Sequence, residues 1–212
     1  MFTGIVEEVG TLRSLHVGER SATLVAAAAA VLEGTGVGDS LLTDGVCLTV
    51  TGLGPSGFTA EVMPETVRRT TLAERRPGDR LNLERAMTLS SRLGGHLVSG
   101  HVDGVGTVLA VRREENAIVL ELEAPEAVSR VSVAQGSVAL DGVSLTIAAI
   151  DAAGLRVALI PHTAAATTLA RLARGAHVNL EADLIAKYVY AFVAGRKPGA
   201  GLTWEMLAEA GF

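Results

Sequence analysis

The chain has 212 residues, of which 49% are hydrophobic and 19% charged, and its formal net charge is −5. This composition is typical of a folded globular protein and excludes an intrinsically disordered one. The small negative charge, without any basic run, excludes the electrostatic pattern of a nucleic-acid-binding protein, and the length suffices for two domains of roughly 90 residues.

Short runs rich in Val, Ile, Leu and Thr, separated by Gly, Asp and Pro, predict strands along most of the chain. In the first half the predicted strands are Thr3–Leu12, Ala22–Ala26, Ser40–Leu42, Val46–Thr51, Phe58–Met63 and Arg80–Leu83. In the second half they are Ser99–Val108, Ala117–Leu122, Ser137–Leu140, Ser144–Ile150, Leu155–Ile160 and His177–Leu180. Because no long crossover helices connect these strands, we expect an all-β fold with one small closed antiparallel barrel in each half.

Two segments of the first half favour helix. The alanine run Ala26–Ala30 predicts a helical turn that leads to Gly34, and Glu65–Glu74 predicts a short helix. The stretch Arg85–Leu93, which follows the last predicted strand of this half, is expected to connect the two barrels.

The C-terminal region departs from the strand pattern. Leu184–Val193 places apolar residues at helical spacing on nearly every face, which predicts a helix that is buried against copies of itself in an oligomer. Gly195 and Lys197-Pro198-Gly199 should end this helix. A second short helix is expected over Trp204–Ala210, with Thr203 as its N-cap.

The landmarks of the first half recur about a hundred positions later. The matched pairs are Gly4–Thr11 with Gly100–Thr107, Asp44–Val50 with Asp141–Ile147, Pro64–Leu72 with Pro161–Leu169, and Asn82–Glu84 with Asn179–Glu181. Such a repeat indicates two copies of one domain, so any ligand pocket should occur twice. Two similar pockets suit a reaction that uses the same molecule twice.

Cysteine content and apolar runs bear on the cellular location. The single cysteine, Cys47, excludes an intramolecular disulfide framework and fits a reducing compartment. The first residues lack the basic segment of a signal peptide, and the longest apolar run, Val25–Leu32, has eight residues and is too short to span a bilayer. We therefore expect a cytoplasmic protein that does not enter a membrane.

The strongest candidate for chemistry is the pair of motifs Asp44-Gly-Val-Cys-Leu-Thr49 and Asp141-Gly-Val-Ser-Leu-Thr146. Side chains alternate along a strand, so Cys47 and Thr49 should share one face, as should Ser144 and Thr146. A hairpin turn followed by a half-buried strand would explain either motif without any function. The replacement of cysteine by serine indicates that the two sites are no longer equivalent.

His101 is a second candidate, because it stands where the first copy has Ile5 and the scaffold therefore does not require it. Its titration range suits proton transfer near neutral pH, although a structural histidine remains the alternative. Three other histidines show no such difference between the copies, and they are interpreted as surface or structural residues: His16, His96 and His177.

Other kinds of site find little support. The histidines and the cysteine lack metal-ligand spacing, so no metal site is expected. Gly34–Gly38 matches neither a Walker loop nor a dinucleotide fingerprint. A Ser-His-Asp triad could be drawn from Ser144, His101 and Asp141, but the spacing gives no geometry for it.

Several motifs, in order along the chain, are shared with one family. They are Met1-Phe-Thr-Gly-Ile-Val-Glu7, Asp44-Gly-Val-Cys-Leu-Thr-Val50, Gly94-Gly-His-Leu-Val-Ser-Gly-His-Val-Asp103, Asp141-Gly-Val-Ser-Leu-Thr146, Ile160-Pro-His-Thr163 and Leu207-Ala-Glu-Ala-Gly-Phe212. On these residues the chain resembles the riboflavin synthase alpha-chain family essentially from end to end.

The resemblance implies two tandem six-stranded antiparallel Greek-key barrels, related by internal duplication, and a C-terminal α-helix that assembles a homotrimer. Residues 1–95 would form the N-terminal lumazine-binding barrel with its linker, residues 96–183 the C-terminal barrel, and residues 184–212 the trimerisation helix and tail. The implied site lies between the N-terminal barrel of one subunit and the C-terminal barrel of its neighbour. Association with lumazine synthase is left open.

The implied reaction is the last step of riboflavin biosynthesis. Two molecules of 6,7-dimethyl-8-ribityllumazine give riboflavin and 5-amino-6-(D-ribitylamino)uracil by transfer of a four-carbon unit, without a cofactor or a metal. A base must remove a proton from a 7-methyl group, and a nucleophile must add to the partner ring. Much of the rate should come from holding the two rings face to face.

Position by position, the resemblance implies two half-sites. The N-terminal half-site would comprise Gly4, Ile5, Val6, Ser40, Cys47, Leu48, Thr49, Glu61, Val62, Met63, Pro64, Glu65 and Thr66. The C-terminal half-site would comprise Gly100, His101, Val102, Ser144, Leu145, Thr146, Ile160, Pro161, His162, Thr163, Ala164 and Ala165. Phe2 and Asp183 match positions close to the site, and Gln135 stands where many members carry a lysine, which replaces a charge contact by a hydrogen bond.

The catalytic roles are hypotheses. We predict that His101 transfers the proton and that Ser144 and Cys47 orient or activate the nucleophile. The main competing interpretation is a non-catalytic, fluorescent lumazine- or flavin-binding protein on the same scaffold, which would have lost the polar set of one barrel. A flavin-binding barrel of an oxidoreductase would need a nucleotide domain, and a purely structural trimer would not explain two diverged pockets.

Overall fold

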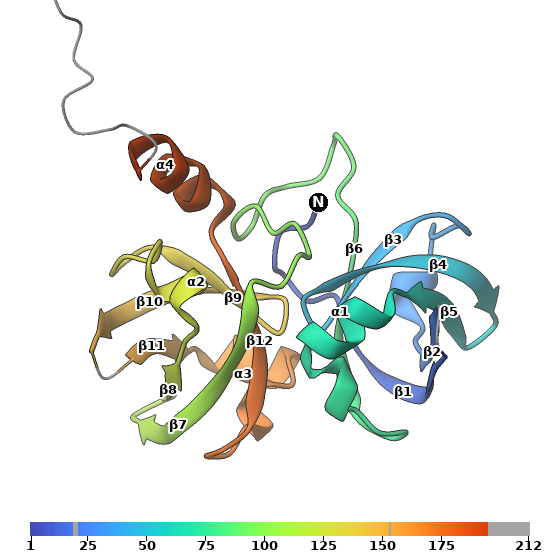
Figure 1. Cartoon of the computed structure of the whole chain (residues 1–212). Coiled ribbons are helices and arrows are strands. Elements are labelled where there is room, and N and C mark those ends of the chain that lie inside the picture. Colours follow the sequence, from blue (N-terminus) through green and yellow to red (C-terminus); the bar gives the residue numbers. More distant parts are fainter. Residues whose placement is uncertain (19–20, 153, 195–212) are drawn as a thin grey trace, which may run out of the picture.

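In the computed structural model, which describes residues 1–18, 21–152 and 154–194, the strands close into two six-stranded antiparallel barrels that lie side by side (Figure 1). The strands of the first barrel are β1 (Glu8–Val17), β2 (Ala22–Ala27), β3 (Ser40–Thr43), β4 (Val46–Gly54), β5 (Gly57–Val62) and β6 (Arg80–Arg85). Those of the second are β7 (Gly104–Glu114), β8 (Ala117–Glu123), β9 (Ser137–Leu140), β10 (Val143–Asp151), β11 (Gly154–Leu159) and β12 (His177–Ala182).

Both barrels have the same strand order. The first runs β1-β2-β5-β4-β3-β6 and closes where β1 pairs with β6, and the second runs β7-β8-β11-β10-β9-β12 and closes where β7 pairs with β12. In each barrel the chain leaves the second strand, crosses to the third and returns through the fifth, which is a Greek-key connection. The prediction of two duplicated Greek-key barrels is confirmed.

The predicted strands Thr3–Leu12 and Ser99–Val108 are wrong at their N-terminal ends. β1 begins at Glu8 and β7 begins at Gly104. The physical reason is the positive φ of Gly4 (74°) and of Gly100 (81°), which turns the chain out of the extended conformation several residues before each barrel begins.

The helical predictions need adjustment. Ala26–Ala27 belong to β2, so the helical turn comes later as the 3₁₀ helix η1 (Ala30–Leu32). The helix expected over Glu65–Glu74 is divided, because Thr70 is extended (φ −129°) and its hydroxyl oxygen accepts a hydrogen bond from the Leu72 amide. The remaining helical segments are α1 (Pro64–Arg69), η2 (Thr71–Glu74), α2 (Glu126–Ser129), α3 (Pro161–Ala166), η3 (Leu169–Arg171) and α4 (Leu184–Ala194).

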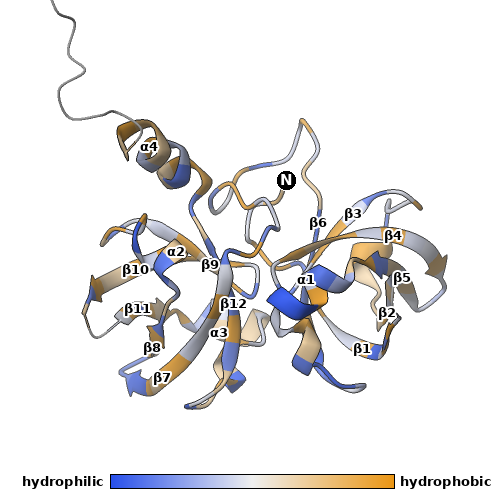
Figure 2. Cartoon of the chain, in the orientation of Figure 1, coloured by the Kyte–Doolittle hydropathy of each residue, from blue (hydrophilic) through white to orange (hydrophobic). Residues whose placement is uncertain are grey.

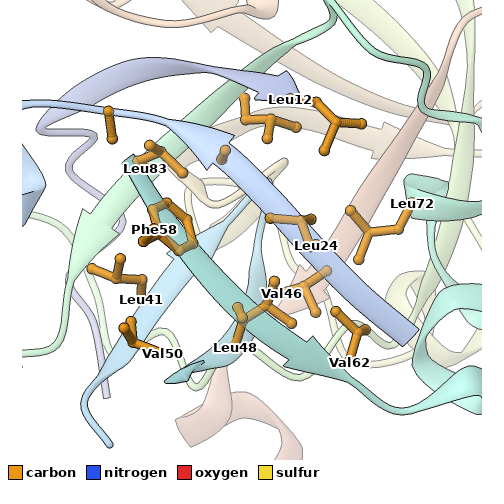
Figure 3. Close-up of a cluster of buried hydrophobic side chains, with 14 of the residues drawn as sticks. Leu12, Leu24, Leu41, Val46, Leu48, Val50, Phe58, Val62, Leu72 and Leu83 are labelled. Atoms are coloured by element: carbon orange, nitrogen blue, oxygen red, sulfur yellow. The ribbon is translucent and has the colours of Figure 1, made fainter. Parts of the chain in front are cut away.

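Each barrel is filled by its own apolar side chains. In the first barrel Leu24, Leu41 and Phe58 come from three different strands and are at most 1% exposed, and Figure 3 shows them converging with their neighbours on one interior. Burying a side chain of this size contributes about 1.5–3 kcal/mol, so the two interiors supply most of the stabilisation. The strand faces that point outward are therefore free to carry polar groups.

The barrels meet at the tips of two equivalent hairpin turns. Asp44-Gly45 joins β3 to β4, Asp141-Gly142 joins β9 to β10, and all four residues have positive φ, as a tight two-residue hairpin requires. A Cβ added to Gly45 would lie 2.8 Å from the main-chain nitrogen of Gly142, and one added to Gly142 would lie 2.9 Å from that of Gly45. The two turns thus touch main chain to main chain.

An apolar cluster completes this contact. Phe2 and Val98 form an isolated antiparallel bridge, with N···O distances of 2.8 and 3.0 Å, and both side chains are fully buried. They pack together with Leu42 and Ala139, which are equivalent residues of β3 and β9. The N-terminus of the chain and the segment between the barrels therefore cross at the contact.

α4 confirms the helix that was predicted over Leu184–Val193 and stands off the second barrel, as Figure 2 shows with its hydrophobic colouring. None of its residues is buried in the single chain, and Tyr188, Phe192 and Val193 are 62–71% exposed. Tyr190 lies under the guanidinium of Arg130 at 4.9 Å. The predicted end of this helix and the predicted helix Trp204–Ala210 with its cap Thr203 lie outside the described residues.

No helix within the described parts of the chain is long and apolar enough to cross a membrane.

Substitution of Gly45 by alanine should destabilise the protein through the contact between the turns. We expect Gly45→Ala to lower the free energy of unfolding by about 3 kcal/mol, because a positive φ and a main-chain clash act together. Gly175→Ala is the matched control, because Gly175 has a similar φ (+85° against +80°) but nothing within 4 Å of its added Cβ, and it should cost only about 1 kcal/mol. Denaturant unfolding measures both, and equal losses would contradict a contact between the turns.

Candidate functional site

The two Asp-Gly motifs place small polar side chains on the outer face of each barrel. In β4, Leu48 is 2% exposed and points into the core, whereas Cys47 is half-buried and Thr49 exposed. In β10, Ser144 is half-buried and Thr146 exposed in the same way. The predicted pairing of Cys47 with Thr49, and of Ser144 with Thr146, on one face of each strand is confirmed.

Two segments outside the barrels cover these strands. We call residues 2–6 the N-terminal strap and residues 98–102 the linker strap. The Ser144 amide donates to the Gly4 carbonyl at 2.8 Å, and the Cys47 amide donates to the Gly100 carbonyl at 2.9 Å. A Cβ on Gly4 would lie 2.6 Å from the Ser144 Cβ, and one on Gly100 would lie 2.5 Å from the Cys47 Cβ. Each strap glycine therefore lies directly against the polar residue of a strand.

The straps are exchanged between the barrels. The N-terminal strap covers Ser144 of the second barrel and Val6 packs against the core of that barrel, whereas the linker strap covers Cys47 of the first barrel and Val102 packs against its core. The expected grouping of Gly4, Ile5 and Val6 with Cys47, and of Gly100, His101 and Val102 with Ser144, is therefore wrong. The grouping followed sequence order, but the Phe2–Val98 bridge sends each strap across to the other barrel.

A buried glutamate holds each strap in place. Glu84 of β6 accepts hydrogen bonds from the Thr3 amide and hydroxyl (2.6 and 2.7 Å) and from the Gly4 amide (3.0 Å). Glu181 of β12 accepts the equivalent bonds from Ser99 (2.7 Å for both groups) and Gly100 (2.9 Å). Burial raises the pKa of Glu84, and the hydrogen bonds from Thr3 and Gly4 oppose this rise.

Ser144 has a histidine partner, but the partner is His96. The His96 Nδ1 lies 2.7 Å from the Ser144 Oγ, and His96 is only 7% exposed. Burial lowers the pKa of His96, and the negative charge of Asp183 opposes this effect. Its Nε2 is buried without a hydrogen-bond partner among the described residues. Neutral imidazole beside a hydroxyl is the arrangement of a base that can accept the hydroxyl proton.

His101 has different surroundings. It is exposed, its Nδ1 lies 3.0 Å from the Ser99 Oγ, and its amide donates to Glu181 at 3.1 Å. Asp141 is buried and accepts from the Asn179 amide. The triad that could be drawn from Ser144, His101 and Asp141 is therefore not assembled, and His101 lies in the strap that covers Cys47.

Some predicted binding residues cannot offer their side chains to a ligand. The predicted binding residues with buried side chains are Phe2, Leu48, Val62, Pro64 and Leu145. Ile5, Met63 and Ile160, by contrast, are 49–65% exposed and apolar. The exposed apolar side chains can cover a flat ring, whereas the buried residues can only present main-chain groups.

The other predicted residues lie at the rims of the barrels. Thr66 belongs to α1 and Thr163 to α3, and Glu65, in the first turn of α1, pairs with Arg68 and Arg69. Gln135 has a positive φ (67°) and donates its amide to Ile147, and Asp183 accepts from the Ile185 amide at the start of α4. Residues placed at the end of β5 or in α3 are Glu61, Pro161, His162, Ala164 and Ala165.

A cavity of about 810 Å³ opens beside the N-terminal strap. Of the predicted residues it is lined by Ile5 and Ser40, and its charged lining comes from Glu7, Glu33, Asp39, Glu84, Arg85 and Arg92. Neither Cys47 nor Ser144 lines it. Ser40 of β3 pairs with Thr49 of β4, so its side chain lies on the strand face that carries Thr49 and Cys47. Within the described residues, no group of three His, Cys, Asp or Glu side chains could hold a metal ion.

Sequence reasoning missed three residues of this region. Glu84 and Glu181 end the matched Asn-Leu-Glu segments, and their recurrence was visible although nothing marked them as buried. His96 follows the glycine pair Gly94-Gly95, and a Cβ on Gly95 would lie 2.7 Å from the Ser144 Oγ. The glycine pair was therefore the available signal that this segment packs closely against something.

Comparison with known proteins places the chain in a family. The lumazine binding domain family matches residues 3–86 and 99–183. The chain is 40% identical over 215 residues to the riboflavin synthase of Bacillus subtilis (strain 168), with 100% of both chains covered. The chain belongs to the riboflavin synthase family. Within this riboflavin synthase family it is 47% identical over 193 residues to the protein of Mycobacterium tuberculosis (strain ATCC 25618 / H37Rv), covering 89% of this chain and 96% of that relative.

The fold of this riboflavin synthase family member also resembles solved structures of LumP. LumP complexed with riboflavin has a TM-score of 0.79 at 24% identity, over 86% of this chain and 99% of that one. LumP complexed with 6,7-dimethyl-8-(1'-D-ribityl) lumazine has a TM-score of 0.77 at 24% identity, over 85% and 98%. The two-barrel architecture is therefore shared.

The exchange of straps predicts which substitution exposes Cys47. Glu181→Ala should free Gly100 from its buried acceptor and raise the rate at which a thiol reagent modifies Cys47 by roughly tenfold, since each lost hydrogen bond is worth about 1 kcal/mol. Glu84→Ala is the matched control, because it releases the other strap and should leave the Cys47 rate near that of the wild type. If Glu84→Ala accelerates the modification and Glu181→Ala does not, the assignment of straps to barrels is wrong.

Proposed function

We propose that this chain catalyses the riboflavin synthase reaction, in which two molecules of 6,7-dimethyl-8-ribityllumazine give riboflavin and 5-amino-6-(D-ribitylamino)uracil. The observation that carries the proposal is the full-length identity of 40% to a riboflavin synthase, in a chain that retains polar residues in both half-sites. LumP proteins with the same fold are complexed with the lumazine and with riboflavin, which supports a ligand of this class.

Each half-site combines a strand of one barrel with a strap from the other. One contains Cys47 and Thr49 beneath the linker strap, and the other contains Ser144 and Thr146 beneath the N-terminal strap. Exposed main-chain groups beside such a strand can hydrogen-bond the polar edge of a ring system, as an added strand would. The apolar side chains at the rims, such as Ile160, would cover the ring faces.

Proton transfer in the second half-site is assigned to Ser144 and His96. The Ser144 hydroxyl lies between the outer strand face and the His96 Nδ1, at 2.7 Å from the latter. With His96 neutral, the hydroxyl can pass its proton to Nδ1 while Oγ accepts a proton from the substrate or attacks it. The negative charge of Asp183 favours the imidazolium that forms, because it opposes the effect of burial on the pKa of His96.

The first half-site would use His101 and Cys47. His101 follows the strap glycine that packs on Cys47, and its ring is exposed to solvent. We retain His101 as a proton-transfer group and Cys47 as the residue that orients the nucleophile. The two half-sites thus differ in their chemistry, as donor and acceptor of one unit require.

The reaction itself tests the proposal. Purified protein is incubated with 6,7-dimethyl-8-ribityllumazine and a chelator, without added cofactor, and one riboflavin and one pyrimidine are expected for each two lumazines consumed. Ser144→Ala and His96→Gln should both lower turnover by about a hundredfold or more, with little change in lumazine binding. Lumazine that stays bound and intact in the wild type would instead identify a binding protein like LumP.

The proposed assembly is a cytoplasmic homotrimer formed through α4, with each site between the first barrel of one subunit and the second barrel of its neighbour. The support is the exposed apolar surface of α4, on which Ile185, Val189 and Phe192 recur at helical spacing and are 57–65% exposed. Water-exposed apolar area of this kind is stabilised by burial between copies. A homotrimer would also bring a Cys47 half-site against a Ser144 half-site. The proposed assembly includes association of this homotrimer with lumazine synthase.

A charge on α4 should prevent assembly. Val189→Asp is expected to give monomers in analytical ultracentrifugation and to abolish turnover, since a carboxylate cannot be buried between copies without a partner. Val17→Asp is the matched control, because Val17 of β1 is equally exposed (57%) but lies on a barrel, and the trimer should survive it. Trimers formed by Val189→Asp would contradict the role of α4.

A further inference from the structure

The contact between the barrels encloses two acidic side chains and one basic one. Asp44 and Asp141 are 0% and 1% exposed, and the Arg75 guanidinium reaches both, at 2.7 Å from the Asp44 Oδ2 and 3.6 Å from the Asp141 Oδ2. Two buried carboxylates with one cation leave one negative charge without compensation. Buried charge of this kind is costly, and it is commonly removed by binding a proton.

The remaining groups around the carboxylates are neutral hydrogen-bond donors, apart from one further acid. The Asp44 Oδ1 accepts from the Asn82 amide of β6 at 2.8 Å, and the Asp141 Oδ1 accepts from the Asn179 amide of β12 at 2.7 Å. Asp79, in the turn before β6, adds negative charge near Asp44 and Arg75. Neither Asn82 nor Asn179 can compensate a second carboxylate charge.

The imbalance has its origin in the duplication. Arg75 follows η2 and its counterpart after η3 is Leu172, which packs against the core of the second barrel. Both aspartates recur in the two copies, because both hairpins need the Asp-Gly turn. The arginine does not recur. One cation therefore serves two acids, and it lies closer to Asp44.

We propose that Arg75, Asp44 and Asp141 form a proton-holding positioning centre between the barrels, in which Asp141 is protonated in neutral solution and its ionisation loosens the contact that aligns Cys47 and Ser144. The inference goes beyond the proposed reaction and does not depend on it. Because the two aspartates are buried, the centre acts through the strands that follow the turns.

The path from this centre to the half-sites is short. Asp44 precedes Cys47 by three residues in the turn and strand β4, and Asp141 precedes Ser144 in the same way. Gly45 and Gly142 touch at the turn tips, so repulsion between the two carboxylates acts directly on the main chain that carries both strands. Movement of the turns changes the spacing of both half-sites together.

The electrostatics agree in direction with the geometry. Burial and the negative charge of Asp44 together raise the pKa of Asp141 to about 8, against the opposing effect of Arg75. Burial raises the pKa of Asp44 to about 6, with Arg75 lowering it. A folded-state pKa above the unfolded value gives stability that is complete in acid and is lost as the pH rises through the folded pKa. The centre therefore loses stability as the pH rises from the unfolded-state pKa, about 4, to the folded-state values of about 6 for Asp44 and about 8 for Asp141, and the loss levels off above them.

The first test is the pH dependence of thermal unfolding of the assembled protein. The wild-type midpoint should fall by roughly 5 °C or more between pH 6 and pH 9 through this centre, whereas Asp141→Asn, a neutral isostere that tolerates positive φ, should remove most of that fall. Asp151→Asn is the matched control, since Asp151 lies in an exposed hairpin of the same barrel and should leave the wild-type profile unchanged. Parallel profiles for wild type and Asp141→Asn would overturn the proposal.

A second variant and a second readout separate this centre from a merely structural role. Arg75→Leu introduces the residue found at the equivalent position of the second copy, Leu172. Because Arg75 lowers the pKa of both carboxyl groups, its loss should make the fall steeper and extend it to higher pH. A shallower fall would count against the centre. Modification of Cys47 by a thiol reagent should be roughly fivefold faster in wild type than in Asp141→Asn at pH 9 but equal at pH 6. Equal rates at both pH values would show that ionisation of Asp141 does not reach the half-site. Neither measurement uses turnover, so failure of the proposed reaction would leave both interpretable.

Discussion

Each barrel satisfies the buried polar groups of the other, and the rest of the structure depends on this exchange. The Asn82 side chain donates to the Asp141 carbonyl at 3.0 Å, and the Asn179 side chain donates to the Asp44 carbonyl at 2.7 Å. Their side-chain oxygens accept from the amides of Thr168 and Thr71. Buried main-chain groups without partners are costly, so neither barrel is complete alone. The duplication thus left each barrel with hydrogen bonds to buried groups of the other.

The same crossing builds the candidate sites. A strap that leaves one barrel is held there by a buried glutamate and delivers its glycine carbonyl to a strand of the other barrel, at Ser144 in one case and Cys47 in the other. The bridge between Phe2 and Val98 fixes the crossing point. Both half-sites are attached to the single contact between the barrels, so a shift of that contact moves both. This is the physical basis of the positioning centre proposed for Arg75, Asp44 and Asp141.

The two copies differ at positions with reactive or charged side chains and agree at positions that set the shape of the main chain. The Asp-Gly turns, the Asn-Leu-Glu segments and the strap glycines recur, because the two-fold contact requires the same main-chain shape from both sides. Three equivalent positions of the two copies carry different residues. They are Cys47 and Ser144, Ile5 and His101, and Arg75 and Leu172. A duplicated site can specialise in this way for two roles of one molecule.

The amino-acid sequence by itself determined the two barrels, the duplication, α4 and the outward face shared by Cys47 and Thr49, because strand periodicity and turn residues are local properties. Only the tertiary structure decided that the straps cross, that His96 rather than His101 is the partner of Ser144, and that Glu84 and Glu181 are buried. These contacts join residues 48 to 82 positions apart, and no local pattern encodes which distant residue a glycine or a histidine will meet.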